Sequence, residues 1–383
     1  MKIERVLIRH LRVPLKRPFR TAGLERTASD SVVVELVLED ASSGFGEGVP
    51  REYVTGETPT GCIDFLRDAA ARLIGAECTG FAETVELAAE LPFGDDPLRP
   101  RCAARCALEL ALLDAAGRRV DVSLAKLVAY LPDVASIAQA RDEVRYGVVL
   151  PVDTGSLKAM LYRLYGFQDA KLKVGTDPER DLAFVTRMRK RLGPRVDLRV
   201  DANGGWSSRE APKIMRKLRR LDVSFVEQPI AKGDPVELAR VRRDGQLPVM
   251  IDESLVSERD AQLAVDAKLA DAFNLRLSKN GGLIPLLHLA KLAQDNRIGV
   301  QLGCHPGETG ILSAAGRAVA CSVRNLLYLE GSYDRHVLRR NVIREDVTFG
   351  RGGRAPGLSA PGLGVTVVPE KLDALTVETV EVP

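Results

Sequence analysis

The stretch AKLKVG (170–175) places a charged residue, Lys173, where an apolar run should leave a β-sheet. Four later apolar runs end in the same way, and the five charged residues follow one another at intervals of 25 to 28 residues. The later four are Asp201 in DLRVDANGG, Glu227 in VSFVEQP, Asp252 in PVMIDES and Lys279 in AFNLRLSKNGG. This interval is the length of one strand–loop–helix–loop unit. The repeat predicts a parallel barrel with its active site on one face.

Strand patterns alternate with helical patterns of 10–15 residues from about residue 143 to about residue 335. Two of the predicted helices begin with Asp-Pro, at residues 177–178 and 234–235, which is a typical helix start. Such alternation indicates βαβ units and a parallel sheet. We therefore predict an α/β fold with a modified TIM barrel of the (β/α)7β type.

The regions on both sides of this repeat do not show the alternation of strand and helix patterns. Residues 1–60 are typical of a β-meander, and residues 62–95 and 99–118 favour helices. After a Gly/Pro-rich loop at 351–364, two extended segments are expected to return to the N-terminal region. We predict an α+β capping domain at 1–140, the barrel with the catalytic residues at 141–340, and a C-terminal segment at 341–383 that rejoins the capping domain.

Composition excludes several classes of protein. The formal net charge is +3 on 55 basic and 52 acidic residues, which argues against a nucleic-acid-binding face. We find no apolar run long enough for a signal peptide or a transmembrane helix, so no membrane partner is expected. The six cysteines are scattered without a metal-binding spacing, and free thiols fit a reducing compartment. The sequence predicts a cytoplasmic protein.

Three acidic residues end three successive predicted strands: Asp201, Glu227 and Asp252. Neighbouring parallel strands lie about 4.8 Å apart, so these carboxylates can converge, and they would repel one another without a cation. Oxygen ligands without His or Cys favour Mg²⁺. Each acid alone could equally be a helix cap or a loop charge. Their common register and the following Asn203, Gln228 and Glu253 favour a metal site, with Asn203 and Glu253 in a supporting role.

Lysines lie on both sides of these acids. Lys171 and Lys173 are two residues apart in a strand, so both point to the same face. Two ammonium groups ~7 Å apart repel by about 2.4 kcal/mol at an effective dielectric constant of about 20. We expect this repulsion to lower the pKa of Lys173 and let it act as a base. Lys279, on the sixth predicted strand, would lie across the barrel mouth. Taken singly, each lysine could be an ordinary surface residue.

These motifs together resemble the enolase superfamily and, within it, the muconate-lactonizing subgroup of the mandelate racemase/muconate lactonizing enzyme family. The matching pieces are KLK (171–173), DAN (201–203), EQP (227–229), DES (252–254) and SKNGG (278–282). Near the N-terminus, GFGEG (44–48) resembles the meander of the capping domain. PFRTAG (18–23) and REYVTGET (51–58) resemble its two specificity loops.

The resemblance implies a mechanism and the residues that perform it. Asp201, Glu227 and Asp252 would hold Mg²⁺, with Mn²⁺ as a substitute. Lys173 and Lys279 would exchange the proton α to a substrate carboxylate through a metal-stabilised enediolate, and Lys171 would orient Lys173. Arg20 and Tyr53 become pocket candidates through their loops. The resemblance also implies a small-molecule carboxylate substrate and a homo-oligomer.

The family contains several reactions, and we take a muconate cycloisomerase-like isomerase as the leading hypothesis. The alternatives are a racemase or epimerase of N-acyl amino acids, amino acid derivatives or dipeptides, and a succinylbenzoate synthase-like lyase. A carboxylate-binding relative without turnover and a metal-assisted hydrolase also remain open. LEGSYD (329–334) lacks the Asp-x-Asp that dipeptide epimerases usually carry there, which weakens the dipeptide reading.

The loop GCHPGETG (303–310) departs from the usual pattern of the family. It makes His305 and Glu308 candidates for the pocket wall, together with Glu330 after the eighth predicted strand. His305 could belong to a His–Asp dyad as in the mandelate racemase branch. That dyad needs an Asp on the sixth strand, where this chain has Asn274, Arg276 and Lys279, so a loop or pocket-lining role is the alternative.

Overall fold

A computed structural model describes residues 1–21 and 24–383, with side chains described outside residues 19–25. Its larger sheet has eight parallel strands in chain order, from β5 to β12. They are β5 (Val148–Leu150), β6 (Asp169–Lys173), β7 (Asp197–Asp201), β8 (Val223–Glu227), β9 (Val249–Ile251), β10 (Ala272–Leu275), β11 (Gly299–Leu302) and β12 (Leu326–Leu329). The Gly147 N–H donates to the Leu329 carbonyl at 2.9 Å, so the sheet curls until its first and last strands meet.

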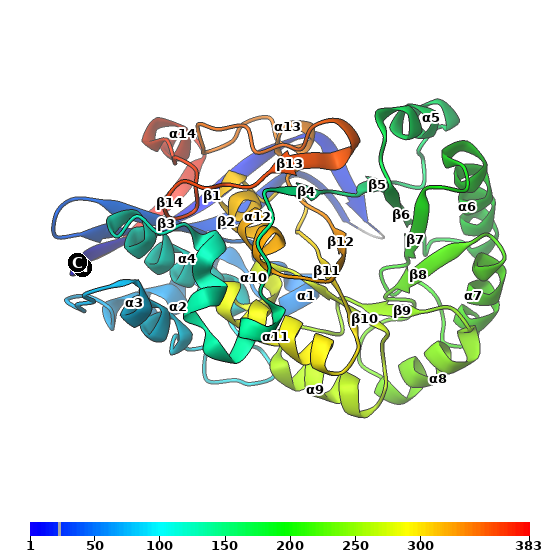
Figure 1. The fold of residues 1–383 in the computed structure, drawn as a ribbon, viewed down its shortest axis with the longest axis horizontal. Coiled ribbons are helices and arrows are strands. Elements are labelled where there is room, and N and C mark those ends of the chain that lie inside the picture. Colours follow the sequence, from blue (N-terminus) through cyan, green and yellow to red (C-terminus); the bar gives the residue numbers. More distant parts are fainter. Residues whose placement is uncertain (22–23) are drawn as a thin grey trace.

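Helices follow the strands around the outside of this sheet (Figure 1). They are α5 (Ser156–Tyr165), α6 (Pro178–Leu192), α7 (Ala211–Arg219), α8 (Pro235–Gly245), α9 (Glu258–Asp266), α10 (Leu277–Asn280), α11 (Leu283–Asp295) and α12 (Gly310–Ser322). The Asp177 and Asp234 side chains accept hydrogen bonds from backbone N–H groups in the first turns of α6 and α8. Both predicted Asp-Pro starts and the (β/α)7β barrel are confirmed.

The smaller sheet is antiparallel, in the order β14–β1–β2–β3. Its strands are β1 (Ile3–Thr21), β2 (Leu24–Leu38), β3 (Ser43–Gly48) and β14 (Thr376–Val382). Helices of the same region are α1 (Glu52–Thr55), α2 (Pro59–Ala71), α3 (Phe81–Ala89), α4 (Cys102–Arg119), η1 (Leu124–Tyr130) and η2 (Pro132–Ile137). The last strand of the chain pairs with the first, which confirms a capping domain built from both ends of the chain.

The structure divides three segments that their local sequence patterns join. The helix expected over 62–95 is two helices, α2 and α3, because Gly75 adopts a left-handed φ of 77° between them. The run 143–152 is two strands: β4 (Glu143–Arg145) pairs with β13 (Arg354–Pro356), and only β5 enters the barrel. The segment 364–372 is not extended throughout, because Pro369 begins α14 (Pro369–Asp373). The remaining short elements are α13 (Asp334–Val337) and η3 (Arg351–Gly353).

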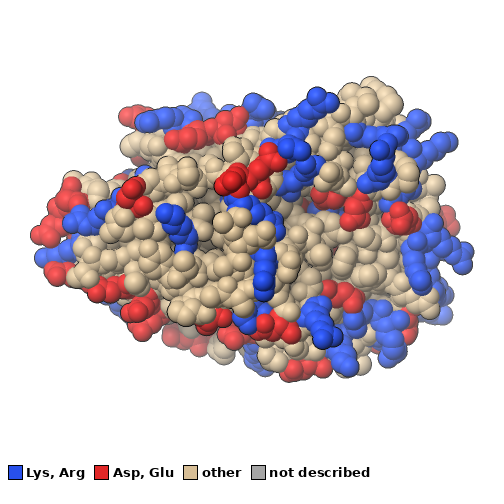
Figure 2. Space-filling view, in the orientation of Figure 1, with Lys and Arg blue, Asp and Glu red and all other residues tan. Residues whose placement is uncertain are grey.

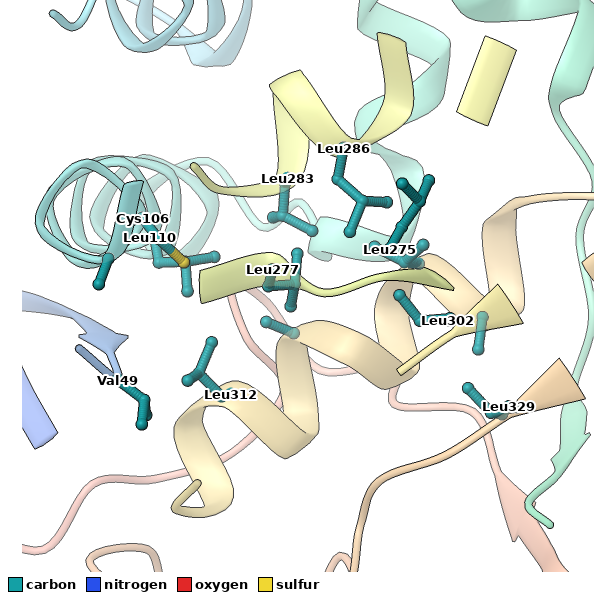
Figure 3. Close-up of a cluster of buried hydrophobic side chains, with 14 of the residues drawn as sticks. Val49, Cys106, Leu110, Leu275, Leu277, Leu283, Leu286, Leu302, Leu312 and Leu329 are labelled. Atoms are coloured by element: carbon teal, nitrogen blue, oxygen red, sulfur yellow. The ribbon is translucent and has the colours of Figure 1, made fainter. Parts of the chain in front are cut away.

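Helix α4 is buried along almost its whole length and joins the cap to the barrel. Figure 3 shows Cys106 and Leu110 of α4 close to Leu277, Leu283 and Leu312 of the barrel helices. Each fully buried leucine contributes about 1.5–3 kcal/mol relative to an exposed one. The cap and the barrel are therefore joined by a continuous apolar core.

Two buried carboxylates of the cap reach the N-termini of barrel helices. Glu47 of β3 accepts hydrogen bonds from Thr309 N–H at 3.0 Å, Thr309 Oγ1 at 2.7 Å and Leu312 N–H at 3.2 Å, at the start of α12. Glu109 of α4 accepts from the N–H groups of Leu283 and Ile284 at the start of α11. A carboxylate at a helix N-terminus satisfies free N–H groups and the helix dipole. These contacts fix the cap over the last helices of the barrel.

The surface and the cysteines agree with the composition. Figure 2 shows acidic and basic side chains interspersed over one face of the molecule. All six cysteines are free thiols, and five of them are buried. Within the described part of the chain, no helix has the length and apolarity needed to cross a membrane.

Candidate active site

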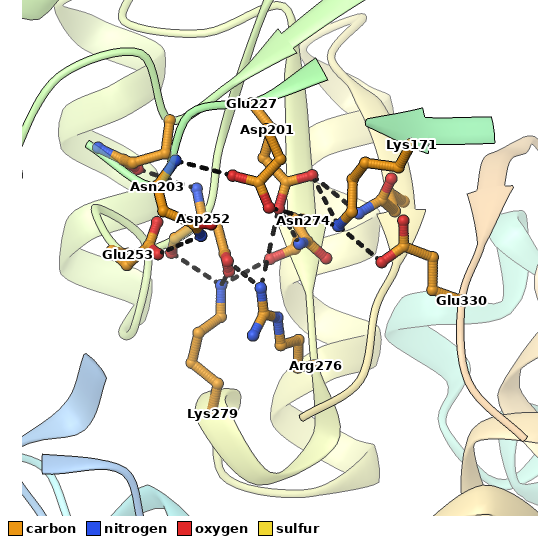
Figure 4. Close-up of polar contacts among 12 residues, drawn as sticks. Lys171, Asp201, Asn203, Glu227, Asp252, Glu253, Asn274, Arg276, Lys279 and Glu330 are labelled. Atoms are coloured by element: carbon orange, nitrogen blue, oxygen red, sulfur yellow. Dashed lines mark hydrogen bonds and ion pairs between the residues drawn. The ribbon is translucent and has the colours of Figure 1, made fainter. Parts of the chain in front are cut away.

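The charged residues of the repeat meet at the carboxyl ends of the barrel strands (Figure 4). Lys173 pairs in register with Asp201, and Asp201 pairs in register with Glu227, so these strand ends are level. Asp252 follows β9 directly. The three carboxylates are essentially inaccessible to solvent, at 0%, 0% and 1% exposure. The structure therefore brings together the three acids that the sequence singled out.

The close packing of these acids changes their protonation. The pKa of Glu227 is raised to about 7. Burial is the largest cause, and the nearby Asp201 raises the pKa by more than Lys171 lowers it. Burial would also raise the pKa of Asp252, but Arg276 and Lys279 lower it well below its ordinary value. The negative charge of the cluster is thus balanced at Asp252 and incompletely balanced at Glu227.

Lys171 and Lys173 both face this cluster from β6. The Lys171 Nζ lies 3.1 Å from Glu227 Oε2, and the Lys173 Nζ lies 2.6 Å from Asp201 Oδ2. Burial is the largest influence and lowers the pKa of Lys173, but the Asp201 and Glu227 carboxylates together outweigh burial, so the pKa lies above its ordinary value. The expectation of a lowered pKa is wrong for the protein without a metal. Attraction to an adjacent carboxylate at 2.6 Å outweighs repulsion by the other lysine.

Lys279 reaches the cluster from the other side. It belongs to the one-turn helix α10 after β10, not to the strand itself as expected. Its Nζ lies 2.8 Å from Asp252 Oδ1 and 2.7 Å from the Asn274 carbonyl oxygen. Burial lowers the pKa of Lys279, and Arg276 lowers it further against the opposing effect of Asp252. Of Lys173 and Lys279, only Lys279 has a pKa below its ordinary value.

The two residues expected to support the carboxylates lie beside them. The Asn203 Oδ1 accepts from Lys173 Nζ at 2.9 Å, and its Nδ2 donates to Glu253 Oε1 at 3.1 Å. The other Glu253 oxygen is buried without a partner among the described residues. Asn203 and Gln228 adopt left-handed φ angles of 43° and 38°, which are unusual for residues with side chains. The turns that place the carboxylates are therefore strained.

A second set of buried polar residues contacts Glu227 and Lys171. Glu330 bridges Lys171 and Arg199, with 2.7 Å to each. Burial would raise the pKa of Glu330, but these two cations lower it to about 2. Asn274 Nδ2 donates to Glu227 Oε1 at 2.7 Å, and Gln301 lies between Arg199 and Glu227. Glu330 was a pocket candidate, and the structure places both of its oxygens in ion pairs.

Three other pocket candidates have described side chains: Tyr53, His305 and Glu308. Tyr53 is exposed, with the Arg26 guanidinium 5.6 Å from its ring centre. His305 is buried, and its Nδ1 lies 3.4 Å from Arg276 Nη1. Glu308 accepts from the His305 N–H at 2.5 Å. The side chain of Arg20 lies outside the described residues.

Sequence reasoning missed two cations in the site. Arg276 contacts Asp252 and lies 3.8 Å from Glu227. From the sequence, Arg276 was considered only because a His–Asp dyad would need an aspartate on its strand. Arg199 contacts Asp169 and Glu330. A signal existed for both, since Arg199 precedes Asp201 by two residues and Arg276 follows Asn274 by two. Alternation along a strand places each pair on one face.

The donor set suits a hard cation such as Mg²⁺. It consists of carboxylate oxygens, and burial and the neighbouring Asp201 raise the pKa of Glu227, so positive charge is needed beside it. In residues 1–21 and 24–383, no three His, Cys, Asp or Glu side chains form a ready-made metal cage. Lysine and arginine nitrogens contact the oxygens that a cation would take. A bound cation would displace these contacts, and the residues present fit it.

Two family models match the chain. The N-terminal domain model of mandelate racemase / muconate lactonizing enzyme matches residues 3–129. The enolase C-terminal domain-like model matches residues 153–371.

Individual relatives match over nearly the whole chain. The L-Lys-D/L-Arg epimerase of Methylococcus capsulatus is 30% identical over 374 residues, or 95% of this chain and 99% of the relative. The N-succinyl Arg/Lys racemase of Bacillus cereus has a crystal structure that covers 100% of both chains, with a TM-score of 0.87 and 26% identity. The dipeptide epimerase of Enterococcus faecalis, solved with Mg and L-Leu-L-Tyr, has a TM-score of 0.83 and 26% identity, covering 96% of this chain and 100% of that one.

Proposed function

Because the chain belongs to the mandelate racemase/muconate lactonizing enzyme family of the enolase superfamily, we propose that it is a Mg²⁺-dependent racemase or epimerase acting α to a substrate carboxylate. The observation that carries this proposal is the position of two lysines at opposite ends of one carboxylate cluster. Lys173 contacts Asp201 at 2.6 Å, and Lys279 contacts Asp252 at 2.8 Å. A group on each side of one α-carbon is what inversion at that carbon requires.

Each residue has a role in this proposal. Asp201, Glu227 and Asp252 would hold Mg²⁺, which when bound supplies positive charge beside the substrate carboxylate and makes the α-proton more acidic. Lys173 would serve one face of the α-carbon and Lys279 the other, so that one lysine removes the α-proton and the other delivers a proton to the opposite face. Lys171 stays charged, because Glu227 and Glu330 more than offset the effect of burial and raise its pKa. We assign it to orienting the substrate carboxylate.

The relatives favour racemisation or epimerisation over the cycloisomerisation taken as the leading hypothesis from sequence. The relatives named above act, by their names, on dipeptides or N-succinyl amino acids. Inversion needs both lysines, whereas a syn cycloisomerisation can use one. The presence of both lysines in contact with the cluster supports the same choice.

Hydrogen–deuterium exchange in D₂O tests the proposal. The enzyme is incubated with Mg²⁺, or Mn²⁺ as a substitute, and a panel of N-succinyl amino acids, N-acetyl amino acids, dipeptides and muconates. We expect the α-proton signal of at least one amino acid derivative to disappear in the ¹H NMR spectrum while its antipode forms. Lactone formation from a muconate without any α-exchange of amino acid derivatives would refute the racemase proposal.

We also propose that the protein is a homo-oligomer whose copies pack through α5. This helix exposes Leu157, Met160, Leu161, Leu164 and Tyr165, and the three leucines are 66%, 54% and 65% exposed. The spacing of these residues makes one apolar face, and Figure 2 shows an uncharged area at the upper right, where Figure 1 places α5.

The charges around this face suit a second copy of the same chain. Asp153 precedes the N-terminus of α5, and Arg163 lies in its last turn. In a pairing about a two-fold axis perpendicular to α5 the helices run antiparallel, so Asp153 of each copy comes near Arg163 of the other. An isologous contact of this kind covers the apolar face of both copies at once.

A further inference from the structure

A groove on the surface of the cap lies where three distant segments of the chain meet. Its volume is about 560 Å³, and it is lined by residues of β1, β2, the start of β14 and the segment 339–340. Figure 1 shows β14 beside β1, and the Arg12 N–H donates to the Leu375 carbonyl oxygen at 2.9 Å. Pockets for small molecules have volumes of about 300–1,000 Å³, so the groove has the size of a small-molecule site.

Three arginine side chains line this groove: Arg12, Arg339 and Arg340. All three residues are exposed to solvent. Among the described residues, none of the three forms an ion pair with a carboxylate within 4.0 Å. Guanidinium groups are charged at all ordinary pH values and repel one another, so an anion that lies among them is attracted by each. The groove therefore favours a negatively charged ligand.

Two acidic residues belong to the segments that line the groove, and both contact other cations. Asp30 is the cross-strand partner of Arg12, and its Oδ1 lies 3.0 Å from His10 Nε2. Asp373 directly precedes the lining residues of β14, and its Oδ1 lies 3.9 Å from Arg9 Nε. These two carboxylates reduce the positive potential of the groove, and neither forms an ion pair with the arginines that line it.

Arg339 is fixed to β1 by its main chain and its side chain. Its N–H donates to the Pro14 carbonyl oxygen at 2.9 Å, and its Nε donates to the Leu15 carbonyl oxygen at 2.9 Å. Among the described residues, its two Nη groups have no acceptor, since the Nε bond is the only hydrogen bond of this guanidinium. The group is planar, so the bond at Nε also limits where the Nη donors point. The groove thus presents this pair of donors in a restricted orientation.

The rest of the lining is mostly apolar. It includes Pro14 of β1, Ala28 of β2, and Leu375 and Val377 at the start of β14. A small ion such as inorganic phosphate would contact the arginines and leave this apolar surface in water. A ligand with an apolar body beside its anionic group would cover both kinds of lining, and each Å² of apolar surface removed from water contributes about 25 cal/mol.

We propose that the groove formed by Arg12, Arg339 and Arg340 binds a soluble phosphate monoester with an apolar or aromatic body. A phosphate monoester carries about 1.5 to 2 negative charges at pH 7 and three strong acceptor oxygens, which matches three guanidinium groups. A monocarboxylate has one charge and two oxygens, so it matches fewer of them. The site lies on the cap, apart from the strand-end carboxylates, and does not depend on the proposed racemase or epimerase function.

Isothermal titration calorimetry of the full-length protein with 1-naphthyl phosphate tests the proposal. EDTA is present, so that no metal ion links the phosphate to the strand-end carboxylates. We expect one site per chain, with an affinity at least about tenfold higher than that for inorganic phosphate, because the naphthyl group covers apolar lining. The affinity for 1-naphthoate should also be lower, and high salt should weaken binding of the phosphate ester.

Variants of two arginines locate the bound phosphate. Arg12→Gln and Arg340→Gln should each lower the affinity about 5- to 10-fold, a moderate loss because exposed charges are screened by water and salt. The double variant should lose at least about 25-fold. Arg259→Gln, at an exposed position of α9, is the matched control and should bind like the wild type. Melting temperatures should stay close to that of the wild type, since the replaced side chains are exposed.

Several results would overturn the proposal. Absence of binding by the wild type at millimolar 1-naphthyl phosphate would do so, and unchanged binding in the double variant would place the phosphate elsewhere. Equal affinities for 1-naphthyl phosphate and inorganic phosphate would show that the apolar lining takes no part. Sedimentation with vesicles that contain phosphatidate, without binding of the soluble ester, would assign the arginines to a membrane surface instead.

Discussion

The Nζ of Lys279 lies 2.8 Å from both a carboxylate oxygen and the main-chain carbonyl oxygen of Asp252. Lys173 makes the corresponding contact with Asp201 at the other end of the cluster. The two contacts differ in their effect on the pKa, which lies below the ordinary value for Lys279 and above it for Lys173. Burial lowers the pKa of both lysines and each has a neighbouring cation, but Asp201 and Glu227 outweigh these effects at Lys173, whereas Asp252 does not at Lys279.

Replacing either Lys173 or Lys279 by alanine should abolish inversion at the α-carbon, while exchange of the α-proton with solvent should persist for one antipode. With Lys173→Ala or Lys279→Ala, proton return on one face is lost, so conversion between antipodes should fall by at least about 10³-fold. Each variant should still exchange the α-proton of the antipode whose face the remaining lysine serves. The measurement is ¹H NMR of both antipodes in D₂O, and Lys190→Ala, an exposed position on α6, is the control. Unchanged inversion in Lys173→Ala would contradict the assignment.

Mg²⁺ should stabilise the folded protein through the carboxylate cluster. A ligand at about 100 times its Kd raises the free energy of unfolding by about 2.7 kcal/mol, so the melting temperature should rise on addition of Mg²⁺. EDTA should remove both the shift and the exchange activity. Asp252→Asn should show no Mg²⁺-dependent shift, whereas Asp95→Asn, at an exposed loop position, should respond like the wild type. Equal shifts in both variants would place the cation elsewhere.

Glu308 should make the protein less stable as the pH rises through the neutral range. Burial raises the pKa of this carboxyl from about 4.5 to about 8, and the hydrogen bond from the His305 N–H opposes this only in part. Between these two values the folded protein holds a proton that the unfolded chain has lost, so the free energy of unfolding falls with increasing pH.

Glu308→Gln tests this dependence, because an amide mimics the protonated carboxyl and keeps the acceptor for His305 N–H. The variant should gain stability relative to the wild type at pH 8.5 and show little gain at pH 4.5. Urea unfolding at both pH values measures the difference. The same difference at both pH values would show that the carboxyl titrates normally.

Removing the Glu47 carboxylate should destabilise the protein strongly. Glu47→Ala leaves the buried donors of Thr309 and Leu312 without an acceptor. Each unsatisfied group costs about 1–3 kcal/mol, so the free energy of unfolding should fall by at least about 3 kcal/mol. Thermal unfolding measures it, with Glu86→Ala on the exposed side of α3 as the control. A loss no larger than that of the control would mean that water replaces the carboxylate.

A charge on α5 should dissociate the oligomer. Leu161→Asp places a carboxylate on each copy of the proposed two-fold contact, where like charges face one another. The molar mass from light scattering should fall while the melting temperature of the separated chain stays close to that of the wild type. Val236→Asp, at an isolated exposed apolar residue of α8, should leave the mass unchanged. A wild-type protein that is already monomeric would refute the α5 contact.

The sequence predicted the barrel because charged residues recur at a regular interval, each at the end of an apolar run, and each such run forms a strand or leads out of one. Register between β6, β7 and β8 then follows from the level ends of parallel strands, so the meeting of Asp201 and Glu227 was predictable. The positions of Asn203 and Glu253 beside them follow from the same loops. The catalytic and metal-binding roles of these residues stay predictions that the experiments above test.

Other features depend on contacts that no local pattern encodes. The contacts of Arg276 with Asp252 and His305 depend on how β9, β10 and β11 lie side by side. The direction of the pKa shift of Lys173 depends on whether a carboxylate lies at 2.6 Å, which spacing alone cannot give. The split of 143–152 into two strands follows from the partner of β4, which lies more than 200 residues later in the chain.

The two cap carboxylates have a consequence for recombination between relatives. Glu47 and Glu109 supply acceptors to the first turns of α12 and α11, so each of these barrel helices is completed by a residue from another part of the chain. A barrel excised after residue 140, or fused to a foreign cap, would lose both acceptors at once. Chimeras should therefore tolerate exchange of the mouth loops, and exchange of the whole cap should succeed only when acids return at these two positions.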